Sequence, residues 1–84
     1  MNIVQTAKFE RSLKKLPTLI IERVVTHTIL FKENPFHTRL NTHKLHGKLK
    51  DQWSFSIDGR YRILSEFDGA DVVFLDVGDH ELYR

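Results

Sequence analysis

The feature of this sequence that most constrains its fold is a pair of alternating segments joined by a tight turn. In the run WSFSI, which begins at Trp53, apolar residues alternate with serine, as expected for a half-buried β-strand. The following Asp58-Gly59 pair favours a hairpin turn, because glycine readily adopts the positive φ that such turns require. Beyond the turn, Ile63 falls on one face of the second strand and Arg62 on the other. We therefore predict a hairpin with one face in the core and the other able to present guanidinium groups.

Two helices are predicted ahead of this hairpin. The segment Ile3-Val4 can form a short first strand, and Thr6 is a suitable N-cap for a helix over residues 7–16, in which apolar residues recur at helical spacing. Pro17 interrupts the helical hydrogen-bond ladder but suits the first turn of a second helix, over residues 18–32. The two helices then form a helical hairpin.

The second helix is apolar around more than one stripe, so part of its surface needs a second neighbour. The interpretation that we favour is burial between the first helix and the sheet, and the alternative is a docking groove for a partner segment. The apolar residues concerned are Leu19, Ile20, Ile21, Val24, Val25, Ile29, Leu30 and Phe31.

A long connection separates the second helix from the sheet. Asn34-Pro35 ends the helix, because the residue before a proline is disfavoured in the helical region, and a segment without clear periodicity continues to Lys50. Loops longer than about 12 residues in compact domains are often functional, although a short turn within residues 38–42 is compatible with the sequence. Strands are then predicted at residues 52–57, 61–67 and 71–77, joined by short turns.

These elements define an α+β fold in the order β-α-α-β-β-β, with the N-terminal helical hairpin packed on one face of a mainly antiparallel, four-stranded sheet. A chain of 84 residues supports one hydrophobic core, so residues 1–84 are expected to form a single domain. The chain has no cysteine, which excludes disulfides and Cys-based zinc sites and suits a reducing cytoplasm. No apolar run approaches the roughly 18 residues that cross a bilayer, and the N-terminus lacks signal-peptide character, so we expect a cytoplasmic protein without a membrane partner.

Positive charge is concentrated in the middle of the chain. Residues 37–62 contain six Lys and Arg against two Asp, together with three of the five histidines, whereas residues 63–84 contain six acidic residues against one Arg. A basic segment of this kind can attract phosphate groups. Ordinary solvated surface is the alternative interpretation.

Two histidines of the basic segment are separated by three positions. His43 and His46 could share a metal ion if the segment were helical, but Gly47 argues against a helix and no third ligand is near in the sequence. We therefore predict neither a metal ion nor another cofactor. The favoured interpretation is that Lys44, Lys48 and one histidine contact a phosphate, with the histidine able to exchange a proton near neutral pH.

A further histidine lies near the C-terminus. His80 follows the last predicted strand, and Tyr83 lies three residues further on. If the fold brings them to Arg60 and Arg62, they form a cationic cleft with proton-transfer groups and an aromatic ring, but without a carboxylate pair or a nucleophilic cysteine. Such a cleft fits phosphodiester chemistry better than acyl transfer. RNA supplies its own 2′-hydroxyl nucleophile, so the protein has only to move protons and stabilise charge on the phosphate.

Several motifs follow one another along the chain: FERSLKKL from Phe9, ENP ending at Pro35, HKLHGKLKDQWSFSI from His43, RYRIL from Arg60 and the terminal VGDHELYR. In this order and spacing they resemble the RelE/ParE superfamily of small toxins from bacterial toxin-antitoxin modules, over nearly the whole chain. The sequence is most similar to the RelE-like and YafQ-like messenger-RNA interferases, which cleave translated mRNA in the ribosomal A site. The resemblance implies the β-α-α-β-β-β fold, metal-independent RNA cleavage on the ribosome, and a cognate antitoxin as partner in a toxin-antitoxin hetero-oligomer.

The resemblance also implies roles for individual residues. His80 takes the place of the terminal histidine, as general acid or, with roles exchanged, as base, and His43 that of an assisting loop histidine. Arg62 or Arg60 takes the place of the strand arginine, and Tyr83 that of a terminal aromatic that stacks on a base or orients the phosphate. The expected catalytic residues are His80, Arg62, His43 and Tyr83, and the expected RNA or phosphate contacts are Arg60, Lys44, Lys48, Lys50 and His46.

Two positions depart from the YafQ-like pattern. Ser56 and Arg60 stand where YafQ-like toxins carry a further histidine and an acidic residue, so part of that branch's catalytic set is missing. Two alternatives therefore stay open. One is a ParE-like inhibitor of DNA gyrase without nuclease activity, and the other is an inactive relative retained as an antitoxin-binding module.

Overall fold

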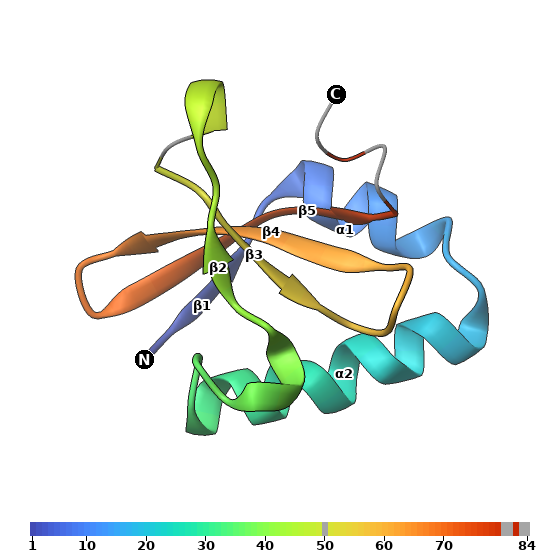
Figure 1. Ribbon diagram of the computed structural model, residues 1–84. Coiled ribbons are helices and arrows are strands. Elements are labelled where there is room, and N and C mark those ends of the chain that lie inside the picture. Colours follow the sequence, from blue (N-terminus) through green and yellow to red (C-terminus); the bar gives the residue numbers. More distant parts are fainter. Residues whose placement is uncertain (50, 80–81, 83–84) are drawn as a thin grey trace.

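Two α-helices and a five-stranded sheet are seen in a computed structural model, which describes residues 1–49, 51–79 and 82 (Figure 1). With η for a short 3-10 helix, the elements in chain order are β1 (Ile3–Gln5), α1 (Ala7–Lys14), α2 (Thr18–Glu33), η1 (Thr38–Leu40), β2 (His43–Lys44), η2 (Gly47–Leu49), β3 (Trp53–Ser56), β4 (Arg62–Asp68) and β5 (Asp71–Gly78). The strand order in the sheet is β1-β5-β4-β3-β2. β1 runs parallel to β5, and the other neighbouring strands are antiparallel.

The predicted α+β class is confirmed, but the sheet has a fifth strand where four were predicted. The additional strand is β2, in the segment that was predicted to be a loop. It is two residues long, and His43 and Lys44 are both exposed, so neither apolar alternation nor burial marks it in the sequence. Only its pairing with β3 at the sheet edge makes it a strand. The short turn within residues 38–42 is present as η1.

Local interactions explain where the helices begin and end. Thr6 caps α1 as predicted, because its Oγ1 accepts a hydrogen bond from the Phe9 N–H at 3.1 Å and satisfies a donor that the first turn leaves free. α1 ends at Lys14, two residues earlier than predicted. The N–H groups of the next two residues bond to carbonyls three positions back, which tightens the last turn. α2 begins directly after Pro17 and ends at Glu33, one residue later than predicted.

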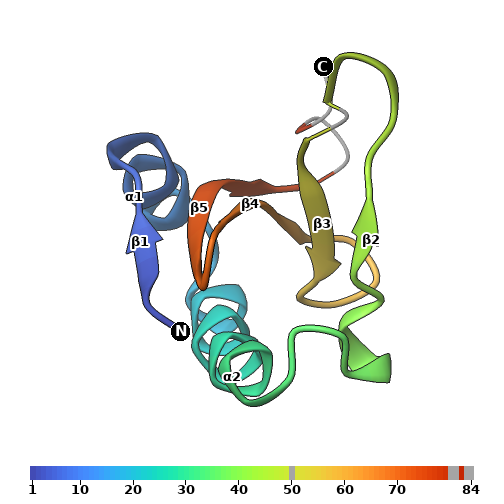
Figure 2. The same ribbon diagram turned by 90° about the vertical axis from the view of Figure 1, so that its left-hand side faces the viewer.

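Four phenylalanines from different elements form the centre of the core. Phe31 of α2 stacks on Phe55 of β3 with ring centroids 4.5 Å apart and meets Phe74 of β5 edge-on at 5.8 Å. Phe9 of α1 packs against Phe74 at 5.4 Å. All four are fully buried. The helices therefore add their side chains to one core, with α2 below the sheet and α1 along its β1–β5 side (Figure 2).

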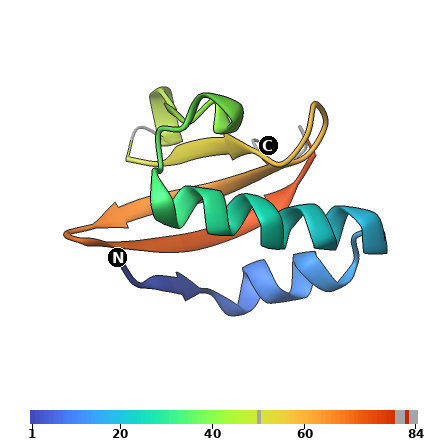
Figure 3. The ribbon, with the colours of Figure 1, turned by 90° about the horizontal axis from the view of Figure 1, so that it is seen from below.

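α2 contacts this core with one stripe only. Ile20, Val24 and Phe31 are buried, whereas three other apolar residues of the helix, Leu19, Val25 and Ile29, are each 57% exposed. The expectation that the apolar surface of this helix is buried between the first helix and the sheet is wrong for these three. Because α1 lies beside β5 and not across α2, no described residue covers the outer side of α2 (Figure 3).

Candidate functional site

His43 and Arg62 lie on the sheet face that α2 does not cover. Residues that pair across neighbouring strands point to the same side of a sheet. One row of such pairs, from β2 to β5, is His43, Ser54, Leu64 and Asp76, and the next row is Ser56, Arg62 and Gly78. Ser54 and Ser56 are two residues apart on β3, so both rows are on one side. Phe55, which lies between them, points into the core on the other side.

Arg62 is oriented by the serine opposite it. Its Nη1 donates a hydrogen bond to Ser56 Oγ at 3.0 Å, and both residues are half-buried. A guanidinium carries several N–H donors in a planar fork, so one bond to a hydroxyl fixes its direction and leaves donors for an anion. Ser56 therefore holds the arginine in place.

His43 is fixed through one ring nitrogen. Its Nδ1 lies 2.9 Å from the carbonyl oxygen of Asn41, and because a carbonyl can only accept, Nδ1 carries the proton in this contact. In the neutral ring, Nε2 is then the acceptor. Asn41 has a left-handed backbone conformation, with φ 48°, at the end of η1, which asparagine tolerates better than most residues. His43 is exposed, so its Nε2 can exchange a proton with a ligand on this face.

Three other predicted contacts lie at or near the edge strand β2. Lys44 pairs with a core-side residue of β3 and so points to the opposite side from His43. His46 follows β2 and Lys48 lies in η2, and both are exposed. The structure thus brings His43 and Arg62 to one face and separates Lys44 from them.

Asp58 fixes the hairpin turn that carries Arg60. Its Oδ1 accepts hydrogen bonds from the backbone N–H groups of Arg60 at 2.7 Å and Tyr61 at 2.8 Å, and its Oδ2 is 3.7 Å from Nη1 of Arg23 on α2. Burial raises the pKa of Asp58, but the two hydrogen bonds and the charges of Arg23 and Arg60 outweigh burial and lower that pKa below its usual value. The guanidinium carbon of Arg60 lies 5.7 Å from the centre of the Tyr61 ring. An anionic carboxylate therefore pins the turn to α2.

Three predicted site residues, Lys50, His80 and Tyr83, lie outside the described residues. Gly78, the partner of Arg62, precedes His80 by two residues in the sequence. The N–H of Leu82 donates to the Asp79 carbonyl at 3.0 Å, and the Leu82 side chain lies against Gly78. The described part of the C-terminal segment therefore returns to the face that holds Arg62.

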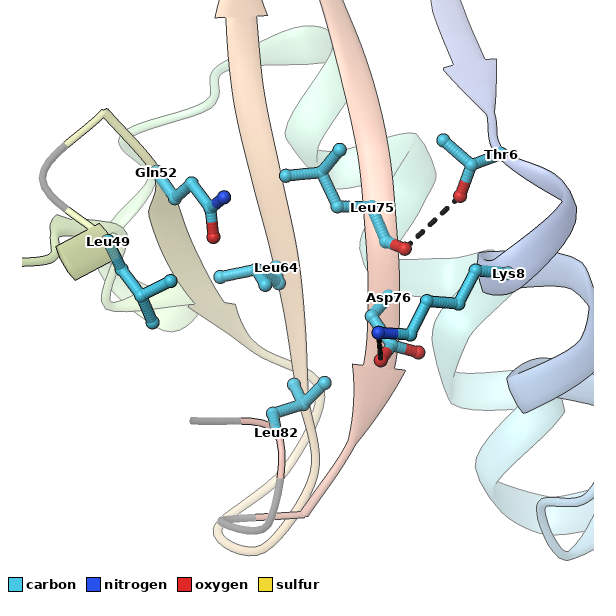
Figure 4. A pocket seen from close by; sticks show the side chains of 8 residues that line it. All are labelled: Thr6, Lys8, Leu49, Gln52, Leu64, Leu75, Asp76 and Leu82. Atoms are coloured by element: carbon cyan, nitrogen blue, oxygen red, sulfur yellow. Dashed lines mark hydrogen bonds and ion pairs between the residues drawn. The ribbon is translucent and has the colours of Figure 1, made fainter. Parts of the chain in front are cut away.

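A cavity of about 410 Å³ opens on the same face (Figure 4). Apolar surface comes from four leucines, Leu49, Leu64, Leu75 and Leu82. Gln52 lies at one end, and at the other Lys8 Nζ is 3.6 Å from Asp76 Oδ2, with Lys8 70% and Asp76 15% exposed. The β4–β5 pairing is irregular between Leu64 and Ser65, and such a bulge allows consecutive residues to reach one side. Leu75 and Asp76 consequently both line the cavity.

None of the residues that line this cavity was predicted to belong to a functional site. Gln52 continues the period-two series of Ser54 and Ser56, and this alternation is the signal that could have placed it on the Arg62 face. Lys8 and Asp76 belong to segments far apart in the chain, and no sequence pattern joins them. Their contact depends on α1 lying along β5.

Within residues 1–49, 51–79 and 82, no three His, Asp or Glu side chains are placed to hold a metal ion together. In the same part of the chain, no helix combines the length and the apolar character needed to span a bilayer.

No protein-family model and no curated protein matches the sequence, but solved structures match the fold over nearly its whole length. A YoeB/ParE toxin from Agrobacterium tumefaciens has a TM-score of 0.80 at 18% identity, covering 95% of this chain and 99% of its own. YafQ from Escherichia coli has a TM-score of 0.82 at 13% identity, covering 98% and 96%. A chain of the RelBE2 toxin-antitoxin complex from Mycobacterium tuberculosis has a TM-score of 0.79 at 28% identity, covering 94% and 96%.

These matches define the class of protein. The fold is that of the RelE/ParE toxin superfamily, which confirms the resemblance predicted from the sequence. Among these structural neighbours, the Agrobacterium tumefaciens protein is a toxin, and the RelBE2 structure is a toxin-antitoxin complex.

Proposed function

We propose that this chain is the toxin of a type II toxin-antitoxin system and acts as a ribosome-dependent mRNA endoribonuclease. The observation that carries the proposal is the position of Arg62 and His43 on one face of a RelE-like sheet, beside the strand end that leads to His80. Inhibition of DNA gyrase, the alternative, assigns no catalytic role to an oriented arginine and a histidine on this face.

The proposed reaction needs only protein side chains and the RNA itself. The ribose 2′-oxygen attacks the adjacent phosphorus, so that an O2′–P bond forms and the P–O5′ bond breaks. His43 takes the 2′-hydroxyl proton at Nε2, the nitrogen that the contact with Asn41 leaves as acceptor. Arg62 stabilises the charge that builds on the phosphate oxygens. His80 gives a proton to the leaving 5′-oxygen, which yields a 2′,3′-cyclic phosphate and a 5′-hydroxyl.

The remaining cations would bind RNA around this centre. Arg60, Lys48 and His46 are exposed and would contact phosphates on either side of the scissile bond, and Lys50 is proposed as a further phosphate contact. Lys44, which points to the other side of the sheet, would not take part. Tyr83 would stack on a base. Contacts of this kind are weakened by salt, because each releases counterions from the nucleic acid.

A cytoplasmic antitoxin is the proposed protein partner. Support comes from the RelBE2 match, which is a toxin-antitoxin complex, and from the exposed apolar residues Leu19, Val25 and Ile29 on α2. An amphipathic antitoxin segment would cover such a stripe. Co-purification with the product of the adjacent reading frame tests this, and a chain that is non-toxic, monomeric and freely expressed alone would contradict it.

Mapping of RNA 5′ ends after induction tests the nuclease activity. A translated reporter should be cut within codons, while the same reporter without a start codon should stay intact. Arg62→Ala should lower cleavage by about 100-fold or more, as expected for loss of one oriented transition-state donor. Arg11→Ala, at an exposed position of α1, is the matched control and should cleave like the parent. Intact messages, or full cleavage by Arg62→Ala, would refute the proposal, and inhibited supercoiling by gyrase in their place would favour the ParE-like alternative.

A further inference from the structure

The cavity beside Arg62 contains a buried polar atom that no described residue satisfies. The side-chain oxygen Oε1 of Gln52 is buried, and no described residue donates a hydrogen bond to it. Its amide points into the cavity from the residue directly before β3 (Figure 4). Buried polar atoms in folded proteins nearly always have a partner, and one that lacks a partner inside a cavity indicates a ligand that supplies the donor.

The lining of the cavity restricts the chemistry of that ligand. Leucine side chains supply apolar surface, while polar groups lie at the two ends, with the Gln52 amide at one and the Lys8–Asp76 ion pair at the other. The volume of about 410 Å³ falls within the range of about 300–1,000 Å³ that is usual for small-ligand sites. A flat molecule with apolar faces and hydrogen-bonding edges fits this arrangement, and a nucleobase has these properties.

The cavity lies close enough to Arg62 to receive the base of an RNA nucleotide whose phosphate contacts that arginine. Leu64, on the cavity surface, is two residues from Arg62 along β4, which corresponds to about 7 Å in a strand. Both residues point to the same side of the sheet. A nucleotide whose phosphate contacts Arg62 can therefore place its base over Leu64, within reach of Gln52.

We propose that Gln52 is a specificity-determining residue that selects adenine next to the cleaved phosphate. A glutamine amide pairs with adenine through two hydrogen bonds, in which Oε1 accepts from the N6 amino group and Nε2 donates to N7. The N6 amino group supplies the donor that Oε1 lacks. The inference rests on the proposed function in one respect, since the adenine belongs to the RNA that is cleaved.

Titration of the purified chain with 5′-mononucleotides measures binding in the cavity without requiring RNA cleavage. Methyl NMR signals of Leu49, Leu64 and Leu75 should shift on addition of AMP, and AMP should bind at least about fivefold more tightly than GMP, CMP or UMP. Gln52→Met keeps the side-chain length without the amide and should remove this preference. Gln5→Met, at an exposed position of β1, is the matched control and should retain it.

A second variant distinguishes pairing from shape. Gln52→Glu keeps an acceptor but removes the Nε2 donor, so the preference should change from adenine to cytosine, whose N4 amino group pairs with a carboxylate. Equal binding of all four nucleotides, or an adenine preference that survives Gln52→Met in a folded variant, would overturn the assignment. So would leucine shifts that only an antitoxin peptide produces, since the cavity would then be a protein-docking site.

The outcomes separate this inference from the proposed function. An adenine preference in solution without mRNA cleavage in cells would contradict the nuclease and keep the base site. Cleavage within codons whose base preference is the same in the parent and in Gln52→Met would keep the nuclease and reject the base site.

Discussion

Ser56→Ala is expected to weaken RNA cleavage by misdirecting Arg62. The serine hydroxyl accepts from Arg62 Nη1 at 3.0 Å. A hydrogen bond to a charged group contributes about 1.5–3 kcal/mol, and because both residues are only half-buried we expect the lower end of that range. A loss of about 1.5 kcal/mol in transition-state stabilisation corresponds to roughly a tenfold lower cleavage rate.

A double-mutant cycle separates this positioning role from an independent one. Cleavage rates are compared for the parent, Ser56→Ala, Arg62→Ala and the double variant on one translated reporter. If the hydroxyl acts through the guanidinium, Ser56→Ala should have almost no further effect once Arg62 is alanine. Ser56→Thr keeps the hydroxyl on a strand-compatible side chain and should restore most of the activity.

The reasoning would be refuted by additivity. If Ser56→Ala lowers cleavage about tenfold in both backgrounds, or if Ser56→Thr is as impaired as Ser56→Ala, the hydroxyl does not act by orienting Arg62. The free energy of unfolding of each variant, measured in urea, serves as the control. A change in stability large enough to unfold part of the sample would account for lost activity without any change in the guanidinium.

Two further predictions concern stability and need no assumption about function. Phe31→Ala should lower the free energy of unfolding by about 3–5 kcal/mol, because Phe31 is fully buried. Phe36→Ala should lower it by about 1 kcal/mol or less, because Phe36 is 57% exposed. Equal losses of the two variants in urea denaturation would contradict the assignment of the core. Asp58→Asn should lower the free energy of unfolding by a constant amount above about pH 5. This difference should shrink as the pH falls, first through the usual pKa of an Asp in the unfolded chain and then through the lowered pKa of Asp58 in the folded protein. The reason is that a carboxyl with a lowered native-state pKa stabilises the fold only while it is ionised. Denaturation curves between about pH 7 and pH 3 test this, and a difference that does not change with pH would be inconsistent with it.

The hairpin was predictable because several independent signals agree on it. Alternation fixes the faces on both strands, and the observed pairing of Phe55 with Ile63 puts two predicted core residues opposite each other. The turn falls at Asp58-Gly59 as predicted, but Gly59 does not adopt the positive φ that was expected; the Asp58 carboxylate holds the turn instead. β2 was not predictable, because its two exposed residues become a strand only through pairing with β3. Sequence periodicity reports burial, and an edge strand with little burial leaves no such record.

The candidate site was predictable in the same uneven way. Period-two alternation placed Arg62 on the face away from the core, as observed. The alternation places Ser56 on the polar face, and the resemblance indicates a missing catalytic histidine there, but neither predicts its hydrogen bond to Arg62. Its contribution could not be seen without the cross-strand register, which pairs residues six positions apart. The contact between Lys8 and Asp76 is even harder to predict from the sequence, because it depends on where α1 lies relative to β5.

The two faces of the sheet have different roles: one carries the core that stabilises the fold, and the other carries the candidate site. The large buried aromatic side chains, Phe31, Phe55 and Phe74 among them, lie on the α2 side and carry most of the apolar burial. On the other side, Ser56 and Arg62 meet through a hydrogen bond and bury little apolar surface. Because hydrophobic stabilisation scales with the apolar area removed from water, substitutions in the Ser56–Arg62 row should change ligand contacts at small cost in folding free energy. A sheet built in this way can vary its chemistry on one face while the opposite face holds the fold.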